Sequence, residues 1–394
     1  MTRRLEVVPA GDPGVVSVAV RAALSGAGPA ILPREPVVAP QARHASAAGG
    51  PEHSVPGVVP KKVALVIETS GSSGVPKRVA LSADALLASV AATESELGGE
   101  GQWLLALPTH YIAGVQVLIR SIVAGTEPVV MPSGHFSART FAALVDQMTA
   151  PLKFSSIVPA QLARLVDAGE DDAGIRDSLR RLDALLIGGQ AVPAALFTRA
   201  TDLGLNAKRT YGSSETSGGC VYDGHPIGQA LARVTGGELE LAGPMLAEGY
   251  LGDDELTQRK FYTDAGHRWY RTADSGDVTD GMVAVTGRLD NVIISGGIKV
   301  ALDRVERVVQ SRQGFHTAIV VAQPSERWGQ TCVVVTSEPF DDDALSLIQA
   351  AVTEVAGRAA APSRIVRLDV LPTLGSGKPD RLSVARSLAG HPLG

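Results

Sequence analysis

Residues 67–79 read IETSGSSGVPKRV and follow directly on an apolar run, VALVI, at 63–67. A short, continuous apolar run with β-branched residues is typical of a buried strand. The hydroxyls, backbone N–H groups and lysine that come after it are suited to holding phosphate oxygens. The spacing differs from a Walker loop, which needs G-x-x-x-x-G-K-[ST] at the start of a helix. A solvated surface loop is the simpler interpretation of this stretch alone, so the rest of the chain has to decide.

Bulk composition excludes several classes of protein. The chain has 394 residues, 45% of them apolar and 20% charged, which predicts two or three domains of a globular protein. A net charge of −5 gives no reason to expect nucleic acid or an anionic membrane as a partner. Cys220 and Cys332 are too few for a disulfide framework and lack metal-ligand spacing.

The chain shows no targeting or membrane signal. Its N-terminus, MTRRLEVVPAGDP, lacks the apolar core of a signal peptide. We find no stretch of roughly 18 uninterrupted apolar residues, the length that a membrane span requires. We therefore expect a cytoplasmic protein without membrane insertion, and the sequence leaves a homo-oligomer open.

From residue 63 to about 211, strand-like and helix-like segments alternate. The predicted strands lie at 63–67, 103–107, 128–131, 154–158, 184–187 and 207–210. The predicted helices lie at 82–97, 113–123, 138–148 and 193–203. Such alternation favours an α/β fold, in which a parallel-rich sheet is covered by helices.

Polar or glycine-bearing loops follow four of these predicted strands. They are the opening loop, PTHY at 108–111, GGQ at 188–190 and YGSSET at 211–216. Ligands of parallel sheets bind at the carboxyl ends of the strands. We therefore expect all four loops to meet at one edge of one sheet and to form a ligand cleft.

The two ends of the chain differ in residue pattern from the alternating segment between them. Residues 1–60 are expected to form a shortened lead-in to the first domain. Their sequence predicts one helix at 15–24 and irregular structure from 33 to 60. After residue 236, alternation as in ELEL at 238–241 predicts short antiparallel strands, in a small β-barrel-like part. The last hundred residues predict a small, mobile α+β lid, so we expect domains at 1–289 and 290–394.

Five segments now form an ordered set. They read TSGSSGVPK at 69–77, YGSSET at 211–216, YRTAD at 270–274, GRLD at 287–290 with ISGG at 294–297, and GSGK at 375–378. This set resembles the adenylate-forming enzymes, the family of acyl-CoA synthetases, adenylation domains and luciferases. One departure is Ala273, which stands where the family has a glycine.

The resemblance implies that the chain uses ATP. It assigns ATP binding to Thr69, Ser70, Gly71, Ser72, Ser73, Gly74, Lys77, Gly188, Gly189, Gln190, Tyr211, Gly212, Ser214, Asp274 and Arg288. The loop and Lys77 would hold the leaving phosphates, Asp274 the ribose hydroxyls, and the glycines with Tyr211 the adenine. Glu215 is a hard oxygen ligand suited to Mg²⁺ beside phosphates.

The C-terminal motifs imply the catalytic step and the use of CoA. Lys378 would bring a positive charge to the attacking carboxylate and the α-phosphate, and is the expected catalytic residue. Asp290 is the expected hinge, about which the lid rotates after adenylation. Ser295, Gly296 and Gly297 would then face the thiol of CoA.

The acid is the least determined substrate. The family often has an aromatic residue before the histidine of the acyl pocket, whereas this chain has Thr109, His110 and then Tyr111, so either ring could face the acid. The phosphate loop also begins unusually early, which implies a reduced sheet on that side. The remaining residues expected to line the acid site are Ser213, Gly218 and Gly219.

This short form, together with YGSSETSGGCVYDG at 211–224, looks most like the actinobacterial o-succinylbenzoate–CoA ligases of menaquinone synthesis. The resemblance implies an aromatic carboxylic acid, ATP and CoA as small-molecule partners, with AMP and pyrophosphate released. Another aryl- or acyl-CoA ligase is the first alternative. A non-catalytic nucleotide-binding homologue is the second, and the presence of Lys77, Glu215, Asp274 and Lys378 argues against it.

Overall fold

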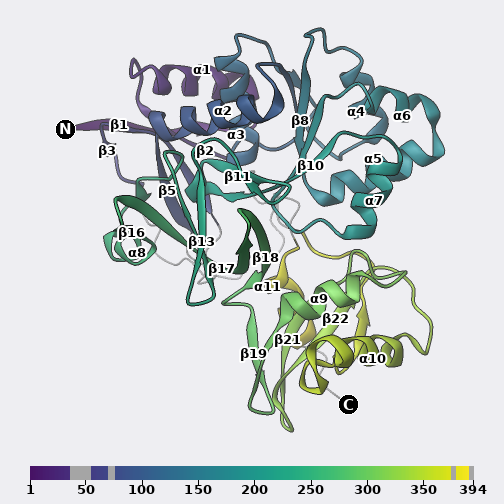
Figure 1. Cartoon of the computed structure of the whole chain (residues 1–394). Helices are drawn as coiled ribbons and strands as arrows, with labels where there is room; N and C mark the ends of the chain where they lie inside the picture. The colour runs from purple at the N-terminus through teal and green to yellow at the C-terminus, as the bar shows by residue number, and fades with distance from the viewer. Residues whose placement is uncertain (36–54, 70–75, 374–378, 390–394) are drawn as a thin grey trace, which may run out of the picture.

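The computed structural model describes residues 1–35, 55–69, 76–373 and 379–389. Within these ranges the strands form four sheets, and helices lie on both faces of the central and the C-terminal sheet (Figure 1). The predicted α/β fold is therefore confirmed. In the described ranges, helices fall short of the length and apolar character that a membrane span needs.

The N-terminal sheet has the strand order β15-β5-β4-β2-β1-β3. Its strands are β1 (Thr2–Pro9), β2 (Ala30–Arg34), β3 (Val58–Pro60), β4 (Val63–Thr69), β5 (Lys77–Ser82) and β15 (Gly249–Tyr250). β1, β2 and β4 run parallel, whereas β3, β5 and β15 each pair antiparallel with a neighbour. Helix α1 (Pro13–Leu24) connects β1 to β2, close to the predicted helix at 15–24.

The expectation of irregular structure from 33 to 60 is wrong at both ends. β2 continues to Arg34, and β3 lies at Val58–Pro60, while residues 36–54 are outside the described ranges. The prolines and glycines of this segment are local signals, but β2 and β3 exist because both pair with β1. Pairing with a distant strand overrides such local signals.

The central sheet has the strand order β12-β11-β10-β9-β8-β6-β7. Its strands are β6 (Gln102–Leu105), β7 (Val129–Val130), β8 (Lys153–Ile157), β9 (Ala184–Ile187), β10 (Ala207–Ser213), β11 (Gly218–Tyr222) and β12 (His225–Pro226). The strands from β7 to β10 are parallel, as the alternating pattern predicts. β11 and β12 extend the sheet antiparallel.

Helices cover both faces of the central sheet. α2 (Ala83–Leu97) and α3 (Ile112–Val123) share one apolar core with α1, with the N-terminal sheet and with the inner face of the central sheet. On the other face lie α4 (Ala138–Val145), α5 (Pro159–Asp171), α6 (Ala173–Leu179) and α7 (Ala194–Asp202) (Figure 1). α5 and α6 were not expected from the sequence. Ser82 caps α2, because its hydroxyl accepts a hydrogen bond from the backbone N–H of Ala85.

The four polar loops do not follow four strands of one sheet. The run at 63–67 is β4 of the N-terminal sheet, and its loop leads back into β5 as a hairpin rather than into a helix. The other three loops follow β6, β9 and β10 of the central sheet. An apolar run identifies a buried strand but not the sheet to which it belongs, which is why the expectation failed.

A third, antiparallel sheet is formed by β13-β14-β17-β16, with β18 pairing to β17. Its strands are β13 (Leu231–Thr235), β14 (Glu238–Ala242), β16 (Phe261–Asp264), β17 (His267–Thr279) and β18 (Met282–Arg288). Helix α8 (Asp254–Lys260) precedes β16. The alternation after residue 236 is thus confirmed as antiparallel pairing.

The C-terminal sheet, β20-β19-β22-β21 with β23 beside β22, has helices on both faces. The elements are β19 (Val292–Ser295), β20 (Ile298–Ala301), α9 (Leu302–Gln310), β21 (Ile319–Ser325), β22 (Gly329–Thr336), α10 (Ala344–Ala356), β23 (Ile365–Arg367) and α11 (Arg381–Ala389). α9 and α10 cover one face of this sheet and α11 the other, each with its own apolar cluster. These elements lie together below the rest of the molecule in Figure 1.

Candidate active site

The loop that is expected to bind phosphates connects β4 to β5, and the ends of these two strands form the base of the hairpin, called here the phosphate hairpin. Thr69 and Lys77 are cross-strand partners, and the Thr69 hydroxyl donates to the carbonyl oxygen of Lys77 at 3.5 Å. The residues between them that were expected to bind ATP lie outside the described ranges. They are Ser70, Gly71, Ser72, Ser73 and Gly74.

An ion cluster braces this hairpin base from the N-terminal strands. Glu68 accepts two hydrogen bonds from the Arg34 guanidinium, at 2.9 and 2.6 Å, and one from Arg78 at 3.1 Å. Burial alone would raise the pKa of Glu68, but the two guanidinium groups outweigh it and hold that pKa below its ordinary value. The end of β2, in the lead-in, is therefore tied to the start of the phosphate loop.

The loop after β6 carries the expected acid-pocket rings. The centroids of the His110 and Tyr111 rings lie 4.1 Å apart. His110 Nε2 also lies 4.0 Å from a carboxylate oxygen of Glu35, in the lead-in. Burial lowers the pKa of His110. Helix α3 starts close against this loop, because a Cβ on Gly114 would lie 2.2 Å from the carbonyl oxygen of Pro108.

The glycines after β9 allow a close approach to β10. A Cβ on Gly188 would lie 2.5 Å from the Thr210 hydroxyl oxygen, so a side chain there would require the Thr210 side chain to move. Gly189 has φ +82°, a left-handed conformation that glycine adopts without strain. Gln190 follows it at the edge where adenine binding is expected.

The segment from Tyr211 to Gly219 reverses direction within a few residues. Ser214, Glu215 and Thr216 form a short 3₁₀ turn between β10 and β11. A Cβ on Gly212 would lie 2.1 Å from the carbonyl oxygen of Gly218, so only glycine fits where β10 and β11 pair. The Thr216 hydroxyl accepts a hydrogen bond from the N–H of Ser213 at 2.8 Å, which closes the turn.

Glu215 points back toward the phosphate hairpin. Its side chain is buried, and its Oε1 accepts a hydrogen bond from the Tyr250 hydroxyl at 2.9 Å. The Nζ of Lys77 lies 5.9 Å from the centroid of the same tyrosine ring. Tyr250 thus connects two expected site residues that are 138 positions apart in the sequence.

Asp274 joins the central sheet to the antiparallel sheet. It accepts a hydrogen bond from the Tyr211 hydroxyl at 2.6 Å and one from Arg288 Nη1 at 3.2 Å. Burial raises the pKa of Asp274, even though Tyr211 and Arg288 both favour the carboxylate. The residues expected at the ribose are therefore in direct contact.

The expected hinge is tied to the same cluster. Arg288 holds Asp290 through two parallel hydrogen bonds, from Nε at 2.9 Å and from Nη2 at 2.8 Å. These hydrogen bonds lower the pKa of Asp290. The backbone N–H of Arg288 and the amide of Asn291 both donate to Asp303 of α9, at 2.6 and 2.7 Å.

The glycine turn expected on the CoA side connects β19 to β20. Gly296 and Gly297 have φ of +56° and +80°, and the indole of Trp328 lies so close to Gly296 that a Cβ would be 2.6 Å from it. Among the residues that the structure describes, neither hydrogen bonds nor ion pairs join this turn to Glu215 or Asp274. Lys378 itself lies outside the described ranges.

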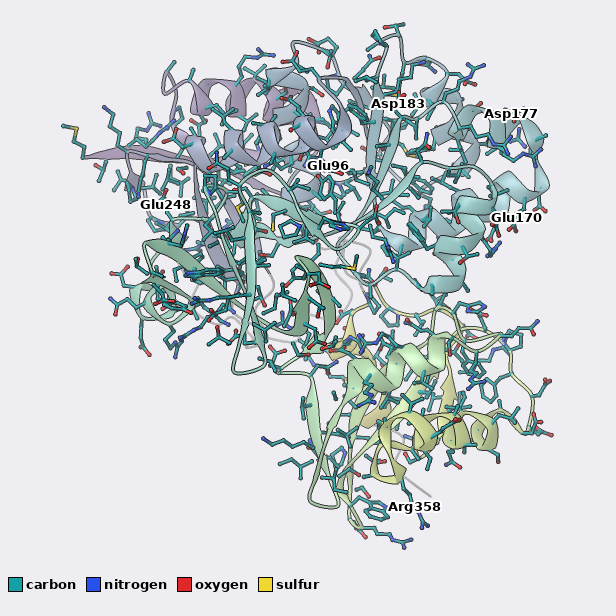
Figure 2. The ribbon with its side chains drawn as sticks, viewed as in Figure 1. Glu96, Glu170, Asp177, Asp183, Glu248 and Arg358 are labelled. Carbon is teal, nitrogen blue, oxygen red and sulfur yellow. The ribbon has the colours of Figure 1, made fainter. Side chains whose placement is uncertain are left out.

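A cavity of about 350 Å³ opens beside this turn. Its lining is partly polar and partly apolar and consists of Ser295, Ser325, Trp328, Thr331, Gln349, Thr353, Arg358, Ala359, Ala361, Pro362 and Ser363. Figure 2 shows Arg358 at the outer end of the C-terminal part of the molecule. The cavity thus combines an indole ring, hydroxyls and one guanidinium group.

Residues 18–251 match the family model described as AMP-binding enzyme. The chain belongs to this family of AMP-binding enzymes. It is 35% identical over 392 residues to a Mycobacterium tuberculosis protein named probable 2-succinylbenzoate–CoA ligase, with 98% of each chain covered. It is 28% identical to the 2-succinylbenzoate–CoA ligase of Escherichia coli K12, covering 73% of this chain and 61% of that protein.

A solved structure shares the fold of this AMP-binding enzyme along almost its full length. A variant of E. coli MenE with bound OSB-AMS superimposes with a TM-score of 0.75, covering 98% of this chain and 87% of that one at 23% identity. The match to the family model and the mycobacterial relative confirm the expected membership of the adenylate-forming family.

A group of buried polar side chains between α2, α3 and β11 was not expected from the sequence. Gln116 and Arg120, one helical turn apart on α3, are 1% and 3% exposed. Gln116 donates to the carbonyl oxygen of Ser217 at 2.6 Å, and the Arg120 guanidinium lies 4.7 Å from the centroid of the Trp103 ring. Gln116 and Arg120, spaced by four in a helix whose other residues are apolar apart from Ser121, were the available signal.

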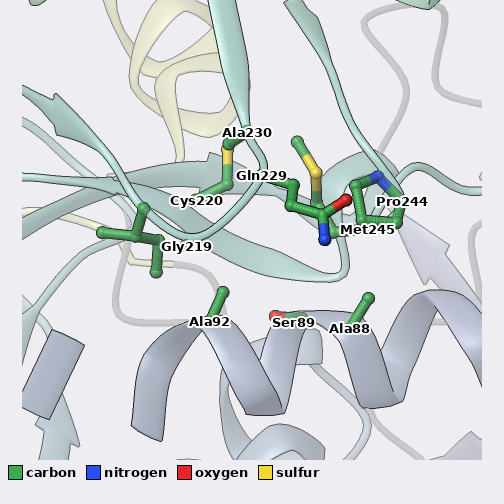
Figure 3. Close-up of a pocket in the computed structure, with 10 residues that line it drawn as sticks. Ala88, Ser89, Ala92, Gly219, Cys220, Gln229, Ala230, Pro244 and Met245 are labelled. Carbon is green, nitrogen blue, oxygen red and sulfur yellow. The ribbon is translucent and has the colours of Figure 1, made fainter. Parts of the chain in front are cut away.

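The apolar side of the Gly218–Gly219 turn is closely packed. A cavity of about 10 Å³, room for one water molecule, remains between Ala88, Ser89 and Ala92 of α2 and the residues around Gly219 and Cys220 (Figure 3). Small side chains on α2 allow the glycine turn to lie this close to the helix.

Proposed function

We propose that this chain is an ATP-dependent ligase that converts o-succinylbenzoate to o-succinylbenzoyl-CoA through an acyl-adenylate. The 35% identity to the mycobacterial protein named probable 2-succinylbenzoate–CoA ligase, over 98% of both chains, carries the proposal. In the first step, a carboxylate oxygen of the acid attacks the α-phosphate, and the bond to the leaving pyrophosphate breaks. In the second, the CoA thiolate attacks the acyl carbon, and AMP leaves. We place the enzyme in the cytoplasm, where both nucleotide substrates are available.

In the first step the protein stabilises charge and holds the nucleotide. We assign the leaving pyrophosphate to the hairpin from Thr69 to Lys77, the ribose to Asp274, and the adenine to Tyr211 with the 188–190 loop. Support comes from the contacts that gather Tyr211, Asp274 and Arg288 at one place. Lys378 is the proposed catalytic cation, positioned where negative charge develops in the transition state.

Glu215 is suited to hold Mg²⁺ together with phosphate oxygens. Its carboxylate is buried, and among the described residues Tyr250 supplies its one side-chain hydrogen bond, to Oε1. The described part of the chain holds no cluster of three or more potential metal ligands. Mg²⁺ is usually bound by one or two carboxylates together with phosphate oxygens and water, and Glu215 can supply one such carboxylate. Bound there, the ion would neutralise phosphate charge.

We propose that CoA approaches from the 295–297 turn, and that the acid lies near His110, Tyr111, Ser213, Gly218 and Gly219. The cavity beside Trp328 supports this placement of CoA, because its indole, hydroxyls and Arg358 suit a base and phosphates. We also propose the division into an ATP- and acid-binding domain at 1–289 and a lid at 290–394. The separate apolar clusters of the C-terminal sheet support this boundary.

A panel of carboxylic acids in a pyrophosphate-release assay, with and without CoA, tests the proposal. We expect o-succinylbenzoate to release pyrophosphate and to give a thioester only when CoA is present. Release with benzoates or fatty acids but not with o-succinylbenzoate would show another acid–CoA ligase. Nucleotide binding without turnover of any acid would support a non-catalytic homologue.

A further inference from the structure

Tyr250 lies where the two halves of the phosphate site meet. It belongs to β15, whose residues pair with β5 immediately after Lys77, with Tyr250 opposite Val79. Its backbone N–H donates to the Thr257 hydroxyl at 2.8 Å, and its ring packs against Phe261 with centroids 5.9 Å apart. The side chain is 5% exposed, so its position is fixed by packing on several sides.

The two ends of this side chain contact two different functional groups. The hydroxyl donates to Glu215 Oε1 at 2.9 Å, and the ring lies 5.9 Å from Lys77 Nζ. The hydroxyl donates to Oε1 alone, and among the described residues no side chain donates to the second carboxylate oxygen, Oε2. Oε2 is therefore available to another ligand.

We infer that Tyr250 is a positioning residue that orients Glu215 for the metal ion and spaces it from Lys77. The inference rests on the proposed function, because it assumes that magnesium and ATP meet at this carboxylate. A hydrogen-bond partner behind a ligating carboxylate fixes its orientation, and its loss typically weakens metal binding about 10-fold or more. Without the hydroxyl, Glu215 Oε1 would be buried without a partner and could rotate away.

A purely structural tyrosine would behave differently. If Tyr250 only filled the core between β5 and Phe261, its variant would lower thermal stability and leave the magnesium requirement unchanged. The chain offers a matched control for that case. Tyr262 also donates to a buried glutamate, Glu240, at 2.6 Å, but it lies in the antiparallel sheet and takes no part in the proposed site.

The experiment compares wild type, Tyr250→Phe and Tyr262→Phe by calorimetric titration with ATP over a range of magnesium concentrations. For Tyr250→Phe we expect metal-free ATP affinity within about twofold of wild type, and a magnesium midpoint about 10-fold higher. For Tyr262→Phe we expect a lower melting temperature with the wild-type magnesium midpoint. Because phenylalanine keeps the ring, the fold is expected to survive.

Two outcomes would overturn the inference. One is a wild-type magnesium midpoint in Tyr250→Phe, and the other is an equal loss of metal-free and magnesium-dependent ATP binding. If wild type itself bound no ATP, the proposed function would fail instead. If Tyr250→Phe lost its cooperative thermal transition, Tyr250→Met, which fills similar volume without a hydroxyl, would take its place in the same titration.

A double-mutant cycle tests whether Tyr250 affects magnesium binding through Glu215. In the Glu215→Gln background, adding Tyr250→Phe should leave the magnesium midpoint unchanged, because the carboxylate that Tyr250 orients is already gone. A further shift of several-fold in the double variant would show that Tyr250 acts on the metal by a path that does not include Glu215, and would contradict the inference.

Discussion

Ala273 has φ +65°, in the left-handed region, at the position where the related motif has a glycine. For a residue with a Cβ, this conformation costs roughly 1–2 kcal/mol. Its N–H donates to Glu238 Oε1 at 2.7 Å, and the Leu289 N–H donates to its carbonyl oxygen at 2.9 Å. These contacts hold the backbone in place, so Asp274 still reaches Tyr211 and Arg288 despite the missing glycine.

Lys378→Ala tests the proposed catalytic residue. We expect pyrophosphate release to fall by about 10²–10³ because one positioned charge is lost, with ATP affinity retained. Thioester formation from supplied acyl-adenylate should persist, because that step does not develop the same charge on the α-phosphate. Both half-reactions can be followed by product chromatography.

Lys61→Ala is the control for this variant, since Lys61 is an exposed lysine in the turn before β4. It should leave both half-reactions unchanged. Unchanged adenylation in Lys378→Ala would remove Lys378 from the mechanism.

At the scale of elements, the antiparallel sheet is held by a buried carboxylate. Glu240 of β14 accepts hydrogen bonds from Tyr262, Arg233 and Thr235, at 2.6, 2.8 and 3.0 Å, and its side chain is 1% exposed. Burial alone would raise the pKa of Glu240, but these donors and the Arg233 charge bring it below its ordinary value. The sheet that carries Asp274 on β17 therefore depends on an ionised glutamate.

Glu240→Gln should lower the free energy of unfolding by about 2 kcal/mol near pH 7, because hydrogen bonds to a charged acceptor are lost. The pKa of Glu240 is lower in the folded than in the unfolded chain, whose value is about 4.3. The stabilisation is therefore complete above the unfolded pKa and is lost as the pH falls through the folded one.

Urea titrations of wild type and Glu240→Gln at pH 7, 5 and 4 measure the difference. Glu255→Gln, on an exposed carboxylate paired with Arg259, is the control and should change stability by less than about 0.5 kcal/mol. A wild-type advantage that grew as the pH fell would contradict the assigned direction.

At the scale of the whole molecule, a few contacts join the C-terminal elements to the rest. Asp303 accepts hydrogen bonds from the backbone of Arg288 and from Asn291, and Arg307 of α9 donates to the carbonyl oxygen of Thr286 in β18. Arg288 also contacts Asp274 and Asp290. The proposed hinge and the proposed ribose site therefore share one guanidinium group.

Asp290→Pro should separate the two half-reactions. Proline fixes φ near −65°, so a rotation about this residue would be blocked in whichever state the ring permits. We therefore expect one half-reaction to stay within several-fold of wild type and the other to fall at least about 10-fold. Asp290→Asn, which leaves φ unrestricted, should retain both rates. Equal rates for both variants in both steps would show that Asp290 is not a hinge.

Local patterns predicted many of the elements, because burial periodicity and caps depend on residues close in sequence. The strand at 184–187 lies where the sequence places it, and α3 (Ile112–Val123) begins one residue before the helix predicted at 113–123. Individual motifs such as 211–216 were equally visible. These patterns do not show which strands pair with one another. The lead-in strands β2 and β3, and the sheet to which β4 belongs, were therefore not predicted.

By itself, the sequence determined that this chain is an AMP-binding enzyme, since its motifs require particular residues at particular spacings. Only the tertiary structure decided how those motifs meet. Tyr250 lies in no expected motif, yet it connects Lys77 to Glu215, because β15 pairs with β5 far along the chain. Contacts between residues distant in sequence depend on the packing of whole elements, which local chemistry does not encode.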